Sequence, residues 1–64
     1  MKPIAIIKML DIDETDEAFA SVRCGNGKVA LALSILTNGD VEVSMSKSQA
    51  AELADALLAA VRQA

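Results

Sequence analysis

Apolar and polar residues alternate along the middle of the chain, from Arg23 to Met45. A period of two residues is typical of β-strands, and two Asn-Gly pairs, at 26–27 and 38–39, interrupt the alternation. Asn and Gly both adopt the positive φ angles that tight hairpin turns require. The stretch therefore predicts three consecutive antiparallel strands, at about 17–25, 28–37 and 41–45.

The first turn fits a two-residue loop at 26–27. This loop places Val22 opposite Leu31 and Cys24 opposite Val29, and every cross-strand pair on that face is apolar. A shift of one residue would set Arg23 beside Val29 and mix the two faces. The two-residue loop is therefore predicted.

The second turn requires a different loop. A two-residue loop at 38–39 would place Glu42 opposite Ile35, on the apolar face. A three-residue loop, Thr37-Asn38-Gly39, with Gly39 left-handed in a bulge, restores one apolar face. It pairs Ile35 with Val41, Leu33 with Val43 and Leu31 with Met45.

This pairing gives the predicted sheet two unlike faces. The first must be buried and carries Val22, Cys24, Val29, Leu31, Leu33, Ile35, Val41, Val43 and Met45. The second is mixed and carries Phe19, Ser21, Arg23, Ala30, Ala32, Ser34, Leu36, Glu42 and Ser44.

A strand precedes the meander and a helix follows it. Residues 4–12 are largely apolar on both sides, with Lys8 among them, and their isoleucines favour a strand over a short helix. Ser46 and Gln49 form a capping box in front of strong helix formers at 47–63. The chain is therefore predicted to be one α+β domain, 1–64, with a four-stranded antiparallel meander and a C-terminal helix (ββββα).

The predicted helix is amphipathic and rich in alanine. Its apolar stripe contains Ala50, Leu53, Ala54, Leu57, Leu58 and Val61. Seven alanines between 50 and 64 allow close approach to another element. Packing on the sheet is the first interpretation, and packing on a second helix is the alternative.

Composition narrows the class of protein. The chain has 64 residues, a net charge of −3 and one cysteine, so it forms no internal disulfide and no cysteine-based zinc site. No apolar run approaches the about 20 residues of a membrane span, and no signal peptide is evident. A protein of the cytoplasm, without a membrane segment, is predicted.

Residues 11–17 contain five acids in seven positions. Asp11 and Asp13 have the spacing of the first two ligands of a calcium loop, but Asp16 stands where its glycine is expected and Val22 where its last acid is expected. A solvated connector is predicted, with cation binding left open.

Candidate catalytic chemistry is sparse. The chain has no histidine, which excludes Ser-His and Cys-His nucleophiles. Cys24 falls on the face predicted to be buried, and 25–28 lacks the spacing of a phosphate loop. No catalytic residue, cofactor or metal is therefore predicted, and the chain is not expected to be an enzyme.

The mixed second face predicts a partner. One helix covers one face of a sheet, and a contiguous apolar patch on a small protein usually marks an interface. We expect a homodimer, or binding of another protein, through that face. The predicted contact residues are Ile7, Phe19, Ala30, Ala32 and Leu36.

The element order and the segment VEVSMSKSQAAEL resemble the single-stranded-DNA-binding transcriptional coactivators, in which a last strand also enters a terminal helix through a Ser/Thr cap. That resemblance implies a helix-mediated dimer that binds nucleic acid. The single aromatic residue, Phe19, leaves no stacking platform for bases, and the net charge is negative, so nucleic-acid binding is the second interpretation. It would use Lys8, Arg23, Lys28 and Lys47.

Overall fold

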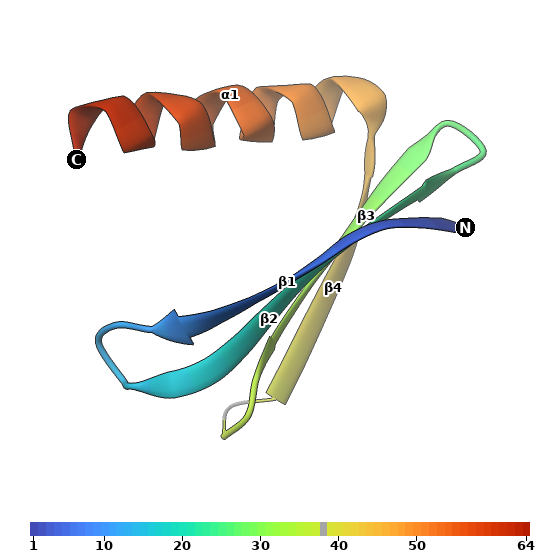
Figure 1. Cartoon of the computed structure of the whole chain (residues 1–64). Coiled ribbons are helices and arrows are strands. Elements are labelled where there is room, and N and C mark those ends of the chain that lie inside the picture. The colour runs from blue at the N-terminus through green and yellow to red at the C-terminus, as the bar shows by residue number, and fades with distance from the viewer. Residues whose placement is uncertain (38) are drawn as a thin grey trace.

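The computed structural model of the chain describes residues 1–37 and 39–64. One antiparallel sheet with strand order β1-β2-β3-β4 carries a single helix, α1, on one side (Figure 1). This confirms the predicted α+β, ββββα arrangement. The elements are β1 (Lys2–Asp11), β2 (Asp16–Gly25), β3 (Lys28–Ile35), β4 (Gly39–Ser46) and α1 (Lys47–Gln63).

The hairpin between β2 and β3 closes as its sequence requires. Asn26 and Gly27 have φ angles of 53° and 75°, so both adopt the left-handed conformation of the predicted two-residue turn. Val22 lies opposite Leu31 and Cys24 opposite Val29. The predicted register of this hairpin is confirmed.

The hairpin between β3 and β4 has a different register from the predicted one. Gly39 adopts the expected positive φ, 86°, but it is the first residue of β4 and lies opposite Ile35. The predicted pairing of Ile35 with Val41 is therefore wrong by two residues, and Asn38 lies outside the described residues. The observed pairs are Leu33 with Val41, Leu31 with Val43 and Val29 with Met45.

A shift of two residues keeps every side chain on its face, so the apolar pattern alone cannot distinguish the two registers. Polar contacts on the other face fit the observed one. The Ser34 hydroxyl donates to Asp40 Oδ1 at 2.5 Å, directly across the β3–β4 pair. This pairing also brings Glu42 level with Ala32, within reach of Arg23 on β2.

The placement of β1 corrects a second expectation. Ile7 lies opposite Ala20, and Met9 lies opposite Ala18. Both therefore share the face of Val22 and Leu31, not the face of Phe19 on which Ile7 was predicted. The register of β1 also shifts at Ile4, between Pro3 and Ala5, which an edge strand tolerates.

The two faces of the sheet can now be named. The helix-side face has four rows across the strands: Lys2, Cys24, Val29 and Met45; Ala5, Val22, Leu31 and Val43; Ile7, Ala20, Leu33 and Val41; Met9, Ala18, Ile35 and Gly39. The outer face carries Ile6, Lys8, Leu10, Glu17, Phe19, Ser21, Arg23, Lys28, Ala30, Ala32, Ser34, Asp40, Glu42 and Ser44.

The strand β4 passes into α1 without a loop. Ser46 is both the last residue of β4 and the N-cap of α1. The Gln49 amide donates to Ser46 Oγ at 3.2 Å, and the Ser46 amide donates to Gln49 Oε1 at 2.9 Å. The predicted capping box is confirmed, and its two hydrogen bonds fix the direction in which the helix leaves the sheet.

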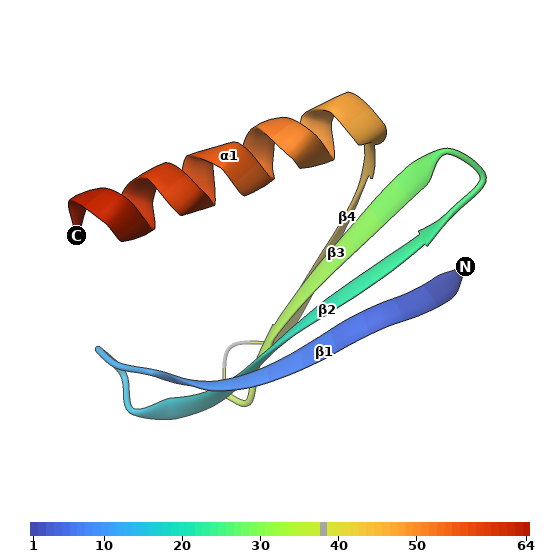
Figure 2. The same ribbon diagram turned by 45° about the horizontal axis from the view of Figure 1, so that its top comes forward.

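The helix diverges from the sheet along its length. Among the described residues, its backbone comes close to β3 and β4 but not to β1 or β2. Figures 1 and 2 both show its C-terminal half standing off from the strands. The radius of gyration, 12.8 Å, accordingly exceeds the about 10.7 Å expected of a compact chain of this length.

We expect Ser46→Ala to lower the free energy of unfolding by about 1 kcal/mol, since one helix amide loses its acceptor. Urea denaturation at a fixed protein concentration measures the change. Ser44→Ala is the control, because Ser44 lies exposed on the outer face of the same strand. Equal stability of the two variants would contradict the role of the cap.

We expect Gly27→Ala to cost about 1–2 kcal/mol, because an L side chain is strained in the left-handed region. Among the described residues, no atom outside Gly27 and its two chain neighbours lies within 4 Å of the new Cβ, so the cost is one of backbone conformation. Gly25→Ala is the control, since Gly25 does not have a positive φ. Thermal unfolding of both variants, with Gly27→Asn as partial rescue, tests the assignment.

Candidate interaction surface

The helix-side face is apolar throughout its middle rows. Charged residues lie only at its ends, with Lys2 in the first row and the pair Asp11 and Asp16 beyond the last. The rows between them contain no charge, and their larger side chains remain about half exposed. Those exposed residues are Ile7, Met9, Leu33, Val41 and Val43.

The apolar stripe of α1 is also uncovered. Its large side chains are least exposed at Leu53, at 38%, and most exposed at Val61, at 74%, with Leu57 at 60% and Leu58 at 53% between them. None of the 17 residues of α1, all of them described, is buried. The helix therefore rests on its own sheet near its N-terminus and leaves the rest of its apolar side free.

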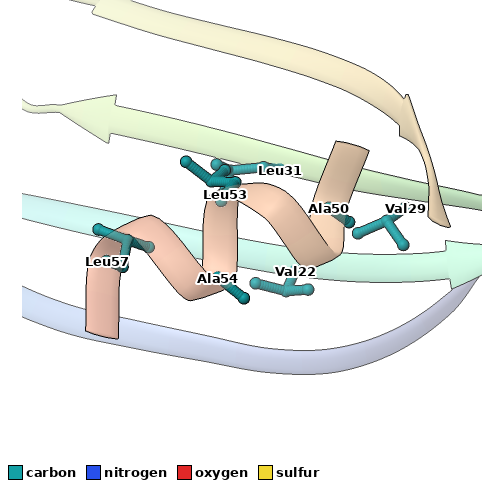
Figure 3. A pocket seen from close by; sticks show the side chains of 7 residues that line it. All are labelled: Val22, Val29, Leu31, Ala50, Leu53, Ala54 and Leu57. Atoms are coloured by element: carbon teal, nitrogen blue, oxygen red, sulfur yellow. The ribbon is translucent and has the colours of Figure 1, made fainter. Parts of the chain in front are cut away.

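An apolar pocket lies between α1 and the sheet (Figure 3). It has a volume of about 180 Å³, and α1 and the sheet contribute side chains to its two walls. The lining residues are Val22, Val29, Leu31, Ala50, Leu53, Ala54 and Leu57. We call this pocket, with the exposed stripe and rows that continue it, the open groove.

The accessible area measures how much the groove leaves uncovered. A compact folded chain of 6.7 kDa exposes about 3,900 Å². This chain exposes 5077 Å², an excess of about 1,200 Å². Of its 15 large exposed hydrophobic residues, nine belong to the helix-side face and the α1 stripe, so most of the large exposed apolar side chains lie in the open groove.

The buried core within one chain is correspondingly small. Among the described residues, the buried ones are Ala20, at 8% exposure, and Ala30, at 1%. Alanine removes little apolar area from water, and burial of larger side chains supplies most of the stability of small domains. Isolated, the chain would lack the apolar burial on which a domain of this size depends.

On the outer face, an ion pair between two side chains of the sheet lies over the middle of β3. Arg23 on β2 donates from Nη2 to Glu42 Oε1 on β4 at 2.7 Å. Because β3 runs between these strands, the pair spans it over Ala30 and Ala32, whose small side chains leave room for it. Ala30 is buried as a result and offers no surface to a partner, contrary to the prediction.

The other predicted contact residues do not form one patch. Phe19 and Ala32 are half-buried on the outer face. Leu36 is exposed, in the turn after β3, where its amide donates to the Glu17 carbonyl at 3.1 Å. Ile7 lies on the opposite face from these three. Sequence reasoning assigned the α1 stripe first to packing on the sheet and, as the alternative, to packing on a second helix. The structure leaves the C-terminal half of the stripe exposed.

The predicted nucleic-acid contacts share a face only in part. Lys8, Arg23 and Lys28 lie on the outer face, and Lys47 is the first residue of α1. Lys8 Nζ lies 3.3 Å from Glu17 Oε1, and Arg23 pairs with Glu42. With Asp40 included, the outer face has as many acids as bases.

The acidic connector folds on itself. Asp11 Oδ1 accepts from the amides of Asp13, at 3.0 Å, and Glu14, at 3.3 Å. Thr15, with a φ of 55°, donates its amide to the Asp11 carbonyl and its hydroxyl to the Glu14 carbonyl. Within residues 1–37 and 39–64, no three acidic or cysteine side chains gather in a metal-binding arrangement.

Comparison with protein-family models, curated proteins and solved structures gives no match to this chain. In the described part of the chain, no helix is both long enough and apolar enough to cross a membrane. The function is therefore inferred from the surfaces of the molecule.

We expect no saturable binding of a labelled single-stranded oligonucleotide at about 0.15 M salt, where charges are screened beyond about 8 Å. The balanced charge of the outer face gives no net attraction for phosphates. Fluorescence anisotropy across a salt series is the measurement. Binding that weakens with salt and is lost in Lys8→Glu or Arg23→Glu would contradict this expectation.

Proposed function

We propose that the chain is a small, non-enzymatic protein-interaction module that self-associates through its helix-side face. The observation that carries this proposal is the excess of about 1,200 Å² in accessible area, together with the nine large exposed hydrophobic residues of the open groove. A standard interface removes about 800 Å² from each partner. The excess is therefore large enough to supply one interface of ordinary size.

The character of the groove supports a protein partner. Its pocket is lined by aliphatic side chains from both walls, with no acid, base or nucleophile among them. Such a surface gains free energy by excluding water, at about 25 cal/mol per Å² of apolar area, and offers no group for catalysis. This argues for association and against chemistry at the groove.

The alternative is nucleic-acid binding through the outer face, in the manner of the coactivators that the topology resembles. Lys8, Arg23 and Lys28 share that face, which favours the alternative. Ion pairs with Glu17 and Glu42 disfavour it, as does the net charge of −3. We place self-association first, in a cytoplasmic setting that the single free cysteine supports.

The first test is the mass in solution, by light scattering on a sizing column over a wide concentration range. We expect a dimer, with twice the 6.7 kDa of one chain. A mass of 6.7 kDa at the highest concentration would contradict self-association.

Two variants then decide which face associates. Val41→Glu introduces a charge on the helix-side face, and Leu36→Glu introduces one in the turn after β3; both parent side chains are exposed in the single chain. We expect Val41→Glu to dissociate the dimer and Leu36→Glu to leave it intact. The reverse pattern would move the interface to the outer face.

A further inference from the structure

The junction between β4 and α1 sets the shape of the open groove. Closing the groove within one chain would require α1 to swing down onto β1 and β2. That motion would turn about Ser46, which is the last residue of β4 and takes part in the two hydrogen bonds of the capping box. We conclude that the groove stays open in the folded chain and has to be filled from outside.

The occupant must present an uncharged apolar surface that is itself uncovered in the isolated chain. The C-terminal half of α1 meets this requirement, with Leu57 and Val61 more than half exposed. Ala60 and Ala64, on the same side of the helix, permit close approach to another backbone. The chain thus contains both the groove and an element that fits it, as a two-fold dimer requires.

The polar side of α1 limits how two copies can meet. Glu52, Asp55 and Arg62 lie opposite the apolar stripe, so the helix has one apolar side and not two. A helix that turned this polar side toward the partner's helix-side face would press its charges onto apolar rows, which is costly. A helix that turns its apolar stripe toward that face keeps the charges in water.

We propose that two copies close their open grooves on each other around a two-fold axis, so that the C-terminal half of each α1 packs on the helix-side face of its partner. Val61 of one copy then lies over the row of Ile7, Leu33 and Val41 in the other. This inference rests on the proposed self-association and adds the geometry of the dimer. The two copies share one apolar core, to which each contributes its α1.

Val61→Glu tests the geometry, because the side chain is 74% exposed in one chain but central in the proposed dimer. We expect the dissociation constant of the dimer to rise more than about 100-fold, since two carboxylates would be buried without partners. Gln63→Glu is the matched control, with the same added charge on the polar side of the same helix. It should leave the constant within about threefold, as expected of a surface change. Circular dichroism establishes that both variants remain folded.

Cross-linking provides a second test that keeps the side chains near their original size. In a Cys24→Ser background, Val61→Cys is placed in one copy and Leu33→Cys in a second copy of different length, and the mixture is treated with a short bis-maleimide. We expect a covalent species of mixed length to dominate. A Phe19→Cys copy in place of Leu33→Cys should give none, because Phe19 lies on the outer face.

The two tests separate the geometry from self-association itself. A wild-type dimer without the mixed cross-link, unaffected by Val61→Glu, would overturn the facing grooves while leaving self-association in place. A wild-type chain that stays monomeric would overturn both.

Discussion

The junction at Ser46 determines the arrangement of the rest of the molecule. Because β4 enters α1 without a loop and the capping box holds the first turn, the helix has one direction available to it. That direction brings its N-terminal half against β3 and carries its C-terminal half away from β1 and β2. The open groove follows from this local geometry and not from a shortage of apolar residues.

The sequence predicts most of the fold because its signals are local. Two adjacent residues with positive φ, at Asn26 and Gly27, fix the register of a whole hairpin, and Ser46 with Gln49 fixes the start of the helix. These features depend on neighbours within a few positions. Element order, faces within each strand and the cap could therefore all be predicted.

The errors concern relations between elements. Alternation places Ile7 and Phe19 on a face of their own strands, but pairing decides which of those faces coincide. A register change of two residues at β4 leaves the alternation intact and depends on contacts such as Ser34 with Asp40. The sequence of α1 cannot show that its apolar stripe is exposed. An amphipathic helix has the same residue pattern whether its own sheet or a partner covers its apolar side.

Each face of the sheet has apolar residues that must be shielded from water, and the two faces differ in what shields them. On the outer face, Arg23 and Glu42 reach across β3, and small residues beneath them make room, so Ala30 is buried without any helix above it. The methylene groups of Arg23 shield apolar surface there, while its guanidinium group stays paired with Glu42 and accessible to solvent. The helix-side face has no such long polar side chains in its middle rows, and its cover has to be another apolar surface. In the proposed dimer, a second copy supplies that surface.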